Sequence, residues 1–169
     1  MIRPATERDL PRIAEIHALA WQEAYKGLLD PAILAPITKE ARLETWTEWF
    51  KHTDQTVHVL ESANKIQGFT RVSPPYETPE DFPQYGELTH IYQQPDGIGT
   101  GIGHRLFEHA KQLIAKGGST GMLLWVLEKN VRARKFYEKQ GMYPDGARKD
   151  EPDWLGEGVF EVRYVLQFD

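Results

Sequence analysis

The stretch Pro95-Asp96-Gly97-Ile98-Gly99-Thr100-Gly101-Ile102-Gly103-His104-Arg105-Leu106 lies between an apolar, strand-like run and an amphipathic, helix-like segment. Four glycines at alternate positions leave the backbone nearly free of side chains, so successive amides can turn toward one ligand. A strand, a glycine turn and a helix N-terminus together favour an anion, because unpaired N–H groups and the positive end of the helix dipole converge there. The stretch therefore predicts a site for a phosphate-bearing cofactor.

Two common phosphate-binding motifs do not fit the spacing of these glycines. A dinucleotide fingerprint requires G-x-G-x-x-G, but counting from Gly97 or Gly99 places Ile102 or His104 where the third glycine should be. A phosphate loop of the G-x-x-x-x-G-K-[ST] type requires a lysine that the stretch does not contain. What remains is a G-x-G-x-G repeat that ends as the helix begins. Its interleaved isoleucines argue against a flexible glycine linker.

Composition bounds the class of protein. The chain has 169 residues, of which 40% are hydrophobic and 27% charged, as in one ordinary globular domain over residues 1–169. The absence of cysteine excludes disulfides, thiolate metal sites and a cysteine nucleophile. A net charge of −5 argues against a general nucleic-acid binder. No apolar signal core follows Met1 and no long apolar run occurs, so we expect a cytoplasmic protein without a membrane partner.

Hydrophobic periodicity and turn residues predict the element order βααβββαβαββ. The predicted strands span residues 2–4, 56–61, 66–72, 87–93, 122–127, 142–148 and 159–166. The predicted helices run from the Thr6 cap to near Gly27, from beyond Pro36 to near Lys51, over residues 102–116, and from the Asn130 cap to Gln140. The proline-rich residues 73–85 form a loop, either on the substrate side or as a plain connector. This order implies an α/β (α+β) fold with one mixed, mostly antiparallel sheet flanked by helices.

Two motifs in this chain resemble those of a known family. The run Leu88-Thr89-His90-Ile91-Tyr92-Gln93, followed by Pro95, Gly99-x-Gly101-Ile102-Gly103 and Leu106, resembles the acetyl-CoA motif of the Gcn5-related N-acetyltransferase (GNAT) superfamily. Downstream, Asn130-x-x-Ala133-x-x-Phe136-Tyr137-Glu138-x-x-Gly141-Met142 is similar to that family's second motif. Outside these motifs the resemblance covers the whole chain only in its architecture.

The resemblance implies a metal-independent N-acetyltransferase. Its co-substrate would be acetyl-CoA, and the acetyl group would pass to a primary amine of a small molecule or peptide by direct attack. A homodimer is common in the family, but the sequence leaves the oligomeric state open. In keeping with metal independence, the chain has no H-E-x-x-H motif, and His104 and His109 are five residues apart rather than four.

The resemblance also assigns residues to the cofactor. The amides of Ile98, Gly99, Thr100, Gly101, Ile102, Gly103 and His104 would surround the pyrophosphate. The backbone of Ile91, Tyr92 and Gln93 would pair with the pantetheine arm, and one of these amides would polarise the thioester carbonyl. Ile98 departs from the family pattern, which usually has Gln or Arg there, so a side-chain contribution to phosphate binding is lost.

Tyr137 is the expected general acid, because its counterpart in the family lies near the cofactor sulfur. Asn130, Ala133 and Tyr137 share one helix face at spacings of three and four, so Asn130 would contact the pantetheine arm. The structural alternative is that Tyr137 is a core aromatic. Phe136, on a different face, is expected in the core.

The general base is less well defined by the sequence. By resemblance, Glu87 lies where many members place a carboxylate that deprotonates the amine through water; otherwise it is an exposed strand residue. Strand alternation places Glu87, Thr89 and Ile91 on one face and His90 on the other, so Glu87 and His90 would not both face the substrate. His90 remains the alternative base.

Trp21 and Tyr25 of the first predicted helix are candidates to bind the amine that accepts the acetyl group, through an apolar wall or a cation–π contact. The alternative is that they take part in ordinary helix packing. Arg132, Arg134, Lys135 and Lys139 form a basic run that would meet the nucleotide 3′-phosphate or simply be a solvated helix face.

Other functions also stay open: a sensor that binds acyl-CoA without turnover, transfer of a longer acyl group, or transfer to a hydroxyl.

Overall fold

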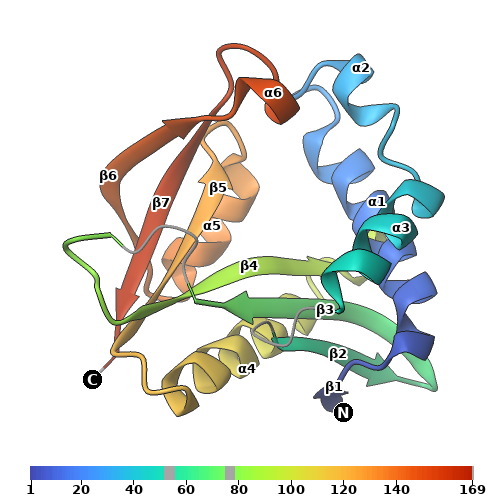
Figure 1. The fold of residues 1–169 in the computed structure, drawn as a ribbon, viewed down its shortest axis with the longest axis horizontal. Helices are drawn as coiled ribbons and strands as arrows, with labels where there is room; N and C mark the ends of the chain where they lie inside the picture. The colour runs from blue at the N-terminus through green and yellow to red at the C-terminus, as the bar shows by residue number, and fades with distance from the viewer. Residues whose placement is uncertain (52–55, 75–78, 169) are drawn as a thin grey trace.

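Seven strands form one sheet in the order β1-β2-β3-β4-β5-β7-β6 (Figure 1). The computed structural model describes residues 1–51, 56–74 and 79–168, and only the backbone of Trp154. The strands are β1 (Ile2–Pro4), β2 (Thr56–Ser62), β3 (Lys65–Ser73), β4 (Tyr85–Gln93), β5 (Gly121–Leu127), β6 (Tyr143–Asp150) and β7 (Phe160–Gln167). Neighbouring strands are antiparallel except β4 and β5, which are parallel. The predicted mixed, mostly antiparallel sheet is confirmed.

The four predicted helices are present in the predicted order, and two short helices are added to them. The helices are α1 (Leu10–Tyr25), α2 (Pro31–Leu34), α3 (Lys39–Trp49), α4 (Ile102–Lys116), α5 (Val131–Lys139) and α6 (Pro152–Leu155), with 3₁₀ turns at Glu7–Asp9 and Pro95–Gly97. The four-residue helices α2 and α6 were not predicted, because one turn is too short to show a helical period. Part of the predicted proline-rich loop, residues 75–78, lies outside the described residues.

Helices cover both faces of the sheet (Figure 1). On one face, α1 and α3 pack over β2 and β3 around Ile13, Trp46 and Phe69, which are fully buried. On the other face, α4 packs mainly over β3 and β4, and α5 packs beside β5 and β7, around Phe107 and Tyr164. No helix within the described residues is long and apolar enough to cross a membrane.

Strands β4 and β5 separate soon after they begin. They pair at only three positions, Tyr85 with Gly121, Gly86 with Met122 and Glu87 with Leu123. Beyond these pairs β4 continues beside β3, and β5 continues beside β7. The two strands run in clearly different directions in Figure 1. The sheet is therefore divided at this point into two halves, and both pockets described below lie at the division.

Buried histidines predict that the protein loses stability in mild acid. Burial lowers the pKa of His17 to about 3, with smaller effects of Arg42 and Arg71, and lowers the pKa of His58 to about 4, with a smaller effect of His109. Because these folded values lie below the unfolded value of 6.5, the stabilisation is complete above pH 6.5 and is lost as the pH falls toward the folded values. We expect the free energy of unfolding to fall by about 2–4 kcal/mol between pH 7 and pH 4.5.

Urea unfolding at the two pH values measures this loss. At pH 4.5 glutamates of ordinary pKa are about half protonated, so carboxylates with a lowered pKa, such as Asp9 and Glu15, add to the loss. The variant His58→Phe removes one titrating histidine and should reduce the loss only in part, because His17, His90 and His109 also have lowered pKa values. A free energy of unfolding that is constant or rises toward pH 4.5 would show that these histidines are not held neutral.

Candidate active site

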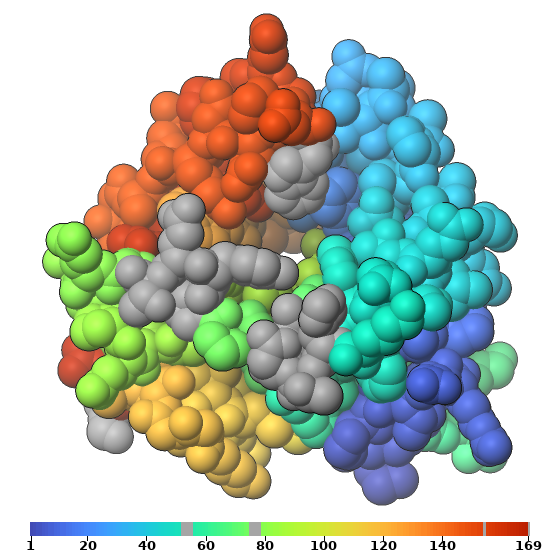
Figure 2. Space-filling model, viewed as in Figure 1, coloured from blue at the N-terminus to red at the C-terminus, as the bar shows by residue number. Residues whose placement is uncertain are grey.

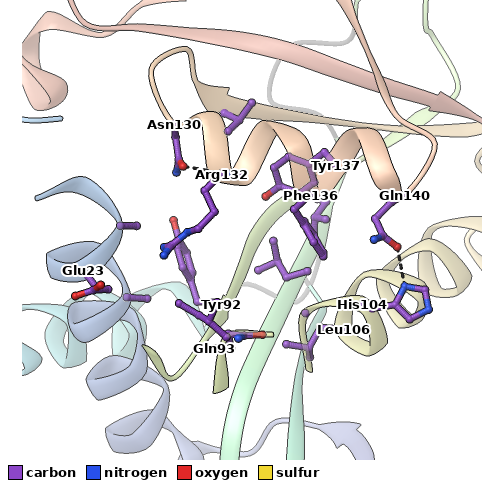
Figure 3. A pocket seen from close by; sticks show the side chains of 18 of the residues that line it. Glu23, Tyr92, Gln93, His104, Leu106, Asn130, Arg132, Phe136, Tyr137 and Gln140 are labelled. Carbon is purple, nitrogen blue, oxygen red and sulfur yellow. Dashed lines mark hydrogen bonds between the residues drawn. The ribbon is translucent and has the colours of Figure 1, made fainter. Parts of the chain in front are cut away.

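A pocket of about 410 Å³ lies where the glycine turn meets α1 and α5. We call it the glycine-turn pocket, and Figure 3 shows it from close by. Its walls come from the C-terminal half of α1, the end of β4, the turn and first residues of α4, the middle of β5, and one face of α5. The two motifs that are distant in the sequence therefore face one shared space.

The glycine turn presents backbone amides to this pocket. Gly99 and Gly101 have φ angles of +83° and +87°, in the left-handed region that favours glycine, and a Cβ added to either would meet nothing within 4 Å. The Arg105 N–H donates to the Gly101 carbonyl at 3.1 Å. The amides of the first turn that precede Arg105 have no acceptor within the helix. Together with the helix dipole, they form a site suited to an anionic group.

The predicted turn residues divide into two groups. Those that line the pocket are Ile98, Gly99, Gly101, Gly103 and His104. The side chains of Thr100 and Ile102 instead support the turn: Thr100 Oγ1 donates to the Gly97 carbonyl at 2.6 Å, and Ile102 Cδ1 would lie 2.9 Å from a Cβ added to Gly97. His104 Nδ1 is hydrogen-bonded to Gln140 Oε1 at 2.7 Å, which joins α4 to α5 (Figure 3).

The end of β4 forms a second wall. Ile91, Tyr92 and Gln93, which were predicted to hold the cofactor arm, all line the pocket. They pair with β3 on one side. On the other side, no strand within the described residues pairs with them, since β5 has already diverged. Backbone groups along this edge are available to an extended ligand, as at other open sheet edges.

Tyr137 lies on the face of α5 that borders the pocket, and its hydroxyl points into it (Figure 3). The ring packs beside Phe107 and Tyr164. Burial raises the pKa of the Tyr137 phenol well above its ordinary value, with a smaller effect of Tyr92, so the hydroxyl keeps its proton at neutral pH. A protonated hydroxyl in this position is suited to donate a proton to a leaving group.

Other predicted residues of α5 take mixed roles. Asn130 lines the pocket, and its Oδ1 accepts a hydrogen bond from the Ala133 N–H at 3.1 Å, which caps the helix. Phe136 packs against the core as expected but also lines the pocket. The basic run divides: Arg132 lines the pocket, whereas Arg134 donates to the Tyr164 hydroxyl at 3.0 Å.

A larger pocket of about 660 Å³ lies on the α1–α3 side of the sheet. We call it the aromatic pocket, because its lining includes His17, Trp21, Tyr25, Trp49, His90, Tyr92 and Trp125. Figure 2 shows a hollow on the viewed face between α3 and the C-terminal segment, two of the parts that line it. Trp21 and Tyr25, the predicted acceptor residues, both line this pocket. Trp21 Nε1 donates to the Tyr92 hydroxyl at 3.0 Å, which fixes the orientation of both rings.

Glu87 and His90 both line the aromatic pocket, so the prediction from strict alternation is wrong. A β-bulge explains the difference: Arg71 pairs with His90 and Val72 with Leu88, so Thr89 is an extra residue in the β4 register. One extra residue reverses the alternation beyond it. Glu87 is buried, with 8% of its surface exposed, rather than an exposed strand residue.

Six charged residues that line the aromatic pocket were not predicted from the sequence, and three of them come from widely separated elements. Arg42 comes from α3, Arg71 from β3 and Glu161 from β7. Burial raises the pKa of the Glu161 carboxyl, while its ion pair with Lys149 at 3.3 Å opposes the rise. The three positions are distant in the sequence and belong to no motif, so only the tertiary fold brings them together.

The two pockets share part of their walls. The residues common to both linings are Tyr25, Leu88, Thr89, Tyr92 and Trp125. Most of them lie on β4 and β5 where these strands diverge. The glycine-turn pocket reaches this wall from the α4–α5 side, and the aromatic pocket reaches it from the α1–α3 side. Two ligands bound in the two pockets would meet at this shared wall.

Residues 13–142 match the model of the acetyltransferase (GNAT) family. The chain belongs to this family. A Mycobacterium tuberculosis protein named "Probable N-acetyltransferase Rv2775" is 30% identical to this GNAT chain, over 98% of the chain and 92% of that protein. An uncharacterized N-acetyltransferase of Archaeoglobus fulgidus is 28% identical over 83% of the chain and 91% of its own length. The resemblance predicted from the two motifs is confirmed.

Solved structures share the fold. The PaiA N-acetyltransferase of Thermoplasma acidophilum, crystallised with coenzyme A, aligns with a TM-score of 0.76 at 18% identity, covering 99% of this chain and 98% of that one. The ribosomal-protein-alanine N-acetyltransferase of Brucella melitensis aligns with a TM-score of 0.73 at 21% identity, covering 99% of each chain. As a GNAT family member, the protein is an acyltransferase whose co-substrate is acetyl-CoA.

Proposed function

We propose that this GNAT protein transfers the acetyl group of acetyl-CoA to a primary amine by direct attack. Acetyl-CoA occupies the glycine-turn pocket, and the amine occupies the aromatic pocket. The observation that carries the proposal is the shared wall of the two pockets at the β4–β5 divergence. Two substrates held against one wall react without a covalent enzyme intermediate, because their reacting atoms are already close together.

In this proposal the cofactor is held mainly by backbone groups. The amides of Gly99 and of residues 101–104 bind the pyrophosphate, since the Ile98 and Thr100 amides already donate to the Pro95 and Gly97 carbonyls at 3.2 Å. The open edge of β4 from Ile91 to Gln93 pairs with the pantetheine arm. One of the β4 amides polarises the thioester carbonyl; one such donor typically contributes about 2.7–4 kcal/mol to transition-state stabilisation. Asn130 contacts the arm through its amide nitrogen, since its Oδ1 already caps α5.

The acetyl-transfer step has a balanced set of bond changes. The amine nitrogen bonds to the acetyl carbon, the carbon–sulfur bond breaks, and the electron pair leaves with sulfur. Glu87 accepts the proton that the amine loses, directly or through water. Tyr137 donates its proton to the departing thiolate. Glu87 lines the aromatic pocket, where the amine is proposed to bind, and Tyr137 lines the glycine-turn pocket, where the thioester is proposed to bind. These positions support the two roles.

The variant Glu87→Gln tests the assignment of the base. We expect kcat to fall by about 10²-fold, the lower end of the range for general-base catalysis. The affinity for acetyl-CoA should not change, because Glu87 does not line the glycine-turn pocket. The matched variant is Glu161→Gln, which alters a half-buried carboxylate of the same pocket. If Glu161→Gln loses activity and Glu87→Gln does not, the base is Glu161.

Ligand-induced stabilisation and thiol release test the function as a whole. Acetyl-CoA or CoA at roughly 100 times its dissociation constant should raise the free energy of unfolding by about 2.7 kcal/mol, whereas NAD and ATP should have little effect. Free thiol should then appear when acetyl-CoA and a suitable amine are both present. Stabilisation by NAD without any by CoA would contradict the proposal. Stabilisation by acetyl-CoA without thiol release from any acceptor would favour a sensor.

A further inference from the structure

Lys149 and Arg163, two cationic side chains that line the aromatic pocket, form ion pairs with carboxylates. Lys149 Nζ lies 3.2 Å from Glu151 and 3.3 Å from Glu161. Arg163 lies 2.6 Å from Asp145. These ion pairs neutralise one end of the pocket, near β6 and β7. Arg42 of α3 and Arg71 of β3 also line the pocket, on the other side of the β4–β5 division.

Arg42 extends from α3 with its guanidinium carbon 5.8 Å from the centre of the Trp21 ring. Its Nε is buried and has no hydrogen-bond partner in the described part of the chain, and the ion pairs found there do not include it. Burial lowers the pKa of this guanidinium. A half-buried cation without an acceptor is unfavourable, and an anionic group on a ligand would relieve this cost.

Arg71 brings a second cation to the same region. Its side chain is almost fully buried, with the guanidinium carbon 4.5 Å from the centre of the Trp49 ring. The His90 ring lies 5.3 Å from the Trp49 ring that Arg71 covers. Burial lowers the pKa of His90, with smaller effects of His17, Arg71 and Arg42. His90 is neutral at neutral pH and adds no positive charge there. The Arg42–Arg71 end of the pocket is therefore suited to an oxyanion.

We propose that the acceptor is a primary amine that also carries a carboxylate, such as an amino acid, and that Arg42 binds this carboxylate with Arg71 beside it. The inference rests on the proposed function, which places the acceptor in the aromatic pocket. The carboxylate fixes the orientation of the acceptor, and the aromatic rings contact its apolar part. Transfer then gives an N-acetyl amino acid and the CoA thiol, with the amine losing one proton and the sulfur gaining one. A polyamine, which presents only positive charge, is disfavoured by the same two arginines.

Matched acceptors test the inference. Thiol release from acetyl-CoA is measured with the common amino acids, with the amide of each active one, and with spermidine. The best amino acid should exceed its own amide in kcat/KM by roughly 10- to 100-fold, the change expected for a hydrogen-bonded ion pair. The amide keeps the amine and side chain and lacks only the negative charge. The comparison therefore isolates the carboxylate.

Variants of α3 assign the effect to Arg42. Arg42→Ala should raise KM for the amino acid by roughly 10-fold or more and leave the amide nearly unchanged, so the preference disappears. Arg42→Lys should restore part of it, because the charge returns without the planar guanidinium. Lys39→Ala, an exposed cation on the same helix, should change neither acceptor.

The remaining outcomes overturn either the carboxylate inference alone or the proposed function as well. Equal use of amino acids and their amides, a preference for spermidine, or activity only with amines that lack a carboxylate would overturn the inference while leaving amine acetylation intact. An equal loss for amino acid and amide in Arg42→Ala would also overturn it, because Arg42 would then act only structurally. Failure of acetyl-CoA to stabilise the protein, or thiol release with no amine at all, would overturn the proposed function itself.

Discussion

Replacing Tyr137 by phenylalanine is expected to lower kcat by roughly 10²- to 10⁴-fold, the range for loss of a general acid. The phenol is held protonated by burial and points into the glycine-turn pocket, so Tyr137→Phe removes the proton donor for the thiolate and keeps the ring. The affinity for acetyl-CoA and the free energy of unfolding should change little. Steady-state kinetics with saturating acetyl-CoA, together with a binding titration, separates the effect on kcat from any effect on binding.

Tyr164→Phe is the matched control. Tyr164 is a fully buried neighbour of Tyr137, but its hydroxyl serves the fold: it donates to Glu138 Oε1 at 2.8 Å and accepts from Arg134 Nε at 3.0 Å. Its loss should cost about 1–3 kcal/mol of stability, as for hydrogen bonds to charged groups, and leave kcat largely intact. If Tyr137→Phe retains kcat, or loses it only in proportion to its stability, Tyr137 is a core residue and not the acid.

The second large effect is expected at the glycine turn. Gly101 caps α4 with φ of +87°, and an added Cβ would enter open space at the pocket. Gly101→Ala should cost about 1–2 kcal/mol of stability because of the left-handed conformation. It should also weaken acetyl-CoA binding by at least about tenfold, equivalent to 1.4 kcal/mol, because the methyl group stands where the pyrophosphate approaches the amides. Calorimetric titration with CoA measures the loss.

Gly146→Ala separates backbone strain from binding. Gly146 lies in β6 with φ of +93°, an added Cβ there also meets nothing within 4 Å, and it does not line the glycine-turn pocket. The two variants should therefore lose similar stability, whereas only Gly101→Ala should lose affinity for CoA. Equal affinities in both variants would show that the turn does not hold the pyrophosphate.

Local features of this chain were predictable from the sequence. Helix α4 begins at Ile102 and ends at Lys116, as predicted, because glycines flank an amphipathic period at both ends. The Asn130 cap and the left-handed Gly141 likewise delimit α5. Since both family motifs belong to these segments, the sequence predicts the elements of the glycine-turn pocket. Each depends on contacts between residues that are close along the chain.

Features that depend on distant contacts were missed. The bulge at Thr89 arises from the register between β3 and β4, and no residue type in the strand predicts it. As a result, Glu87 and His90 line the same pocket, although strict alternation predicts that they lie on opposite faces of the strand. Arg42 and Arg71 meet in that pocket from different elements, so no spacing indicates them. The aromatic pocket is therefore less predictable from the sequence than the glycine-turn pocket.

A crystal structure with acetyl-CoA bound tests the account most directly. It should show the pyrophosphate about 2.7–3.2 Å from amides of the glycine turn, and the arm along the open edge of β4. The sulfur should lie within reach of the Tyr137 hydroxyl, and the acetyl group should lie against Tyr92 and Trp125, facing the aromatic pocket. Acetyl-CoA bound in the aromatic pocket, or a thioester turned away from Tyr137 and the shared wall, would contradict the account.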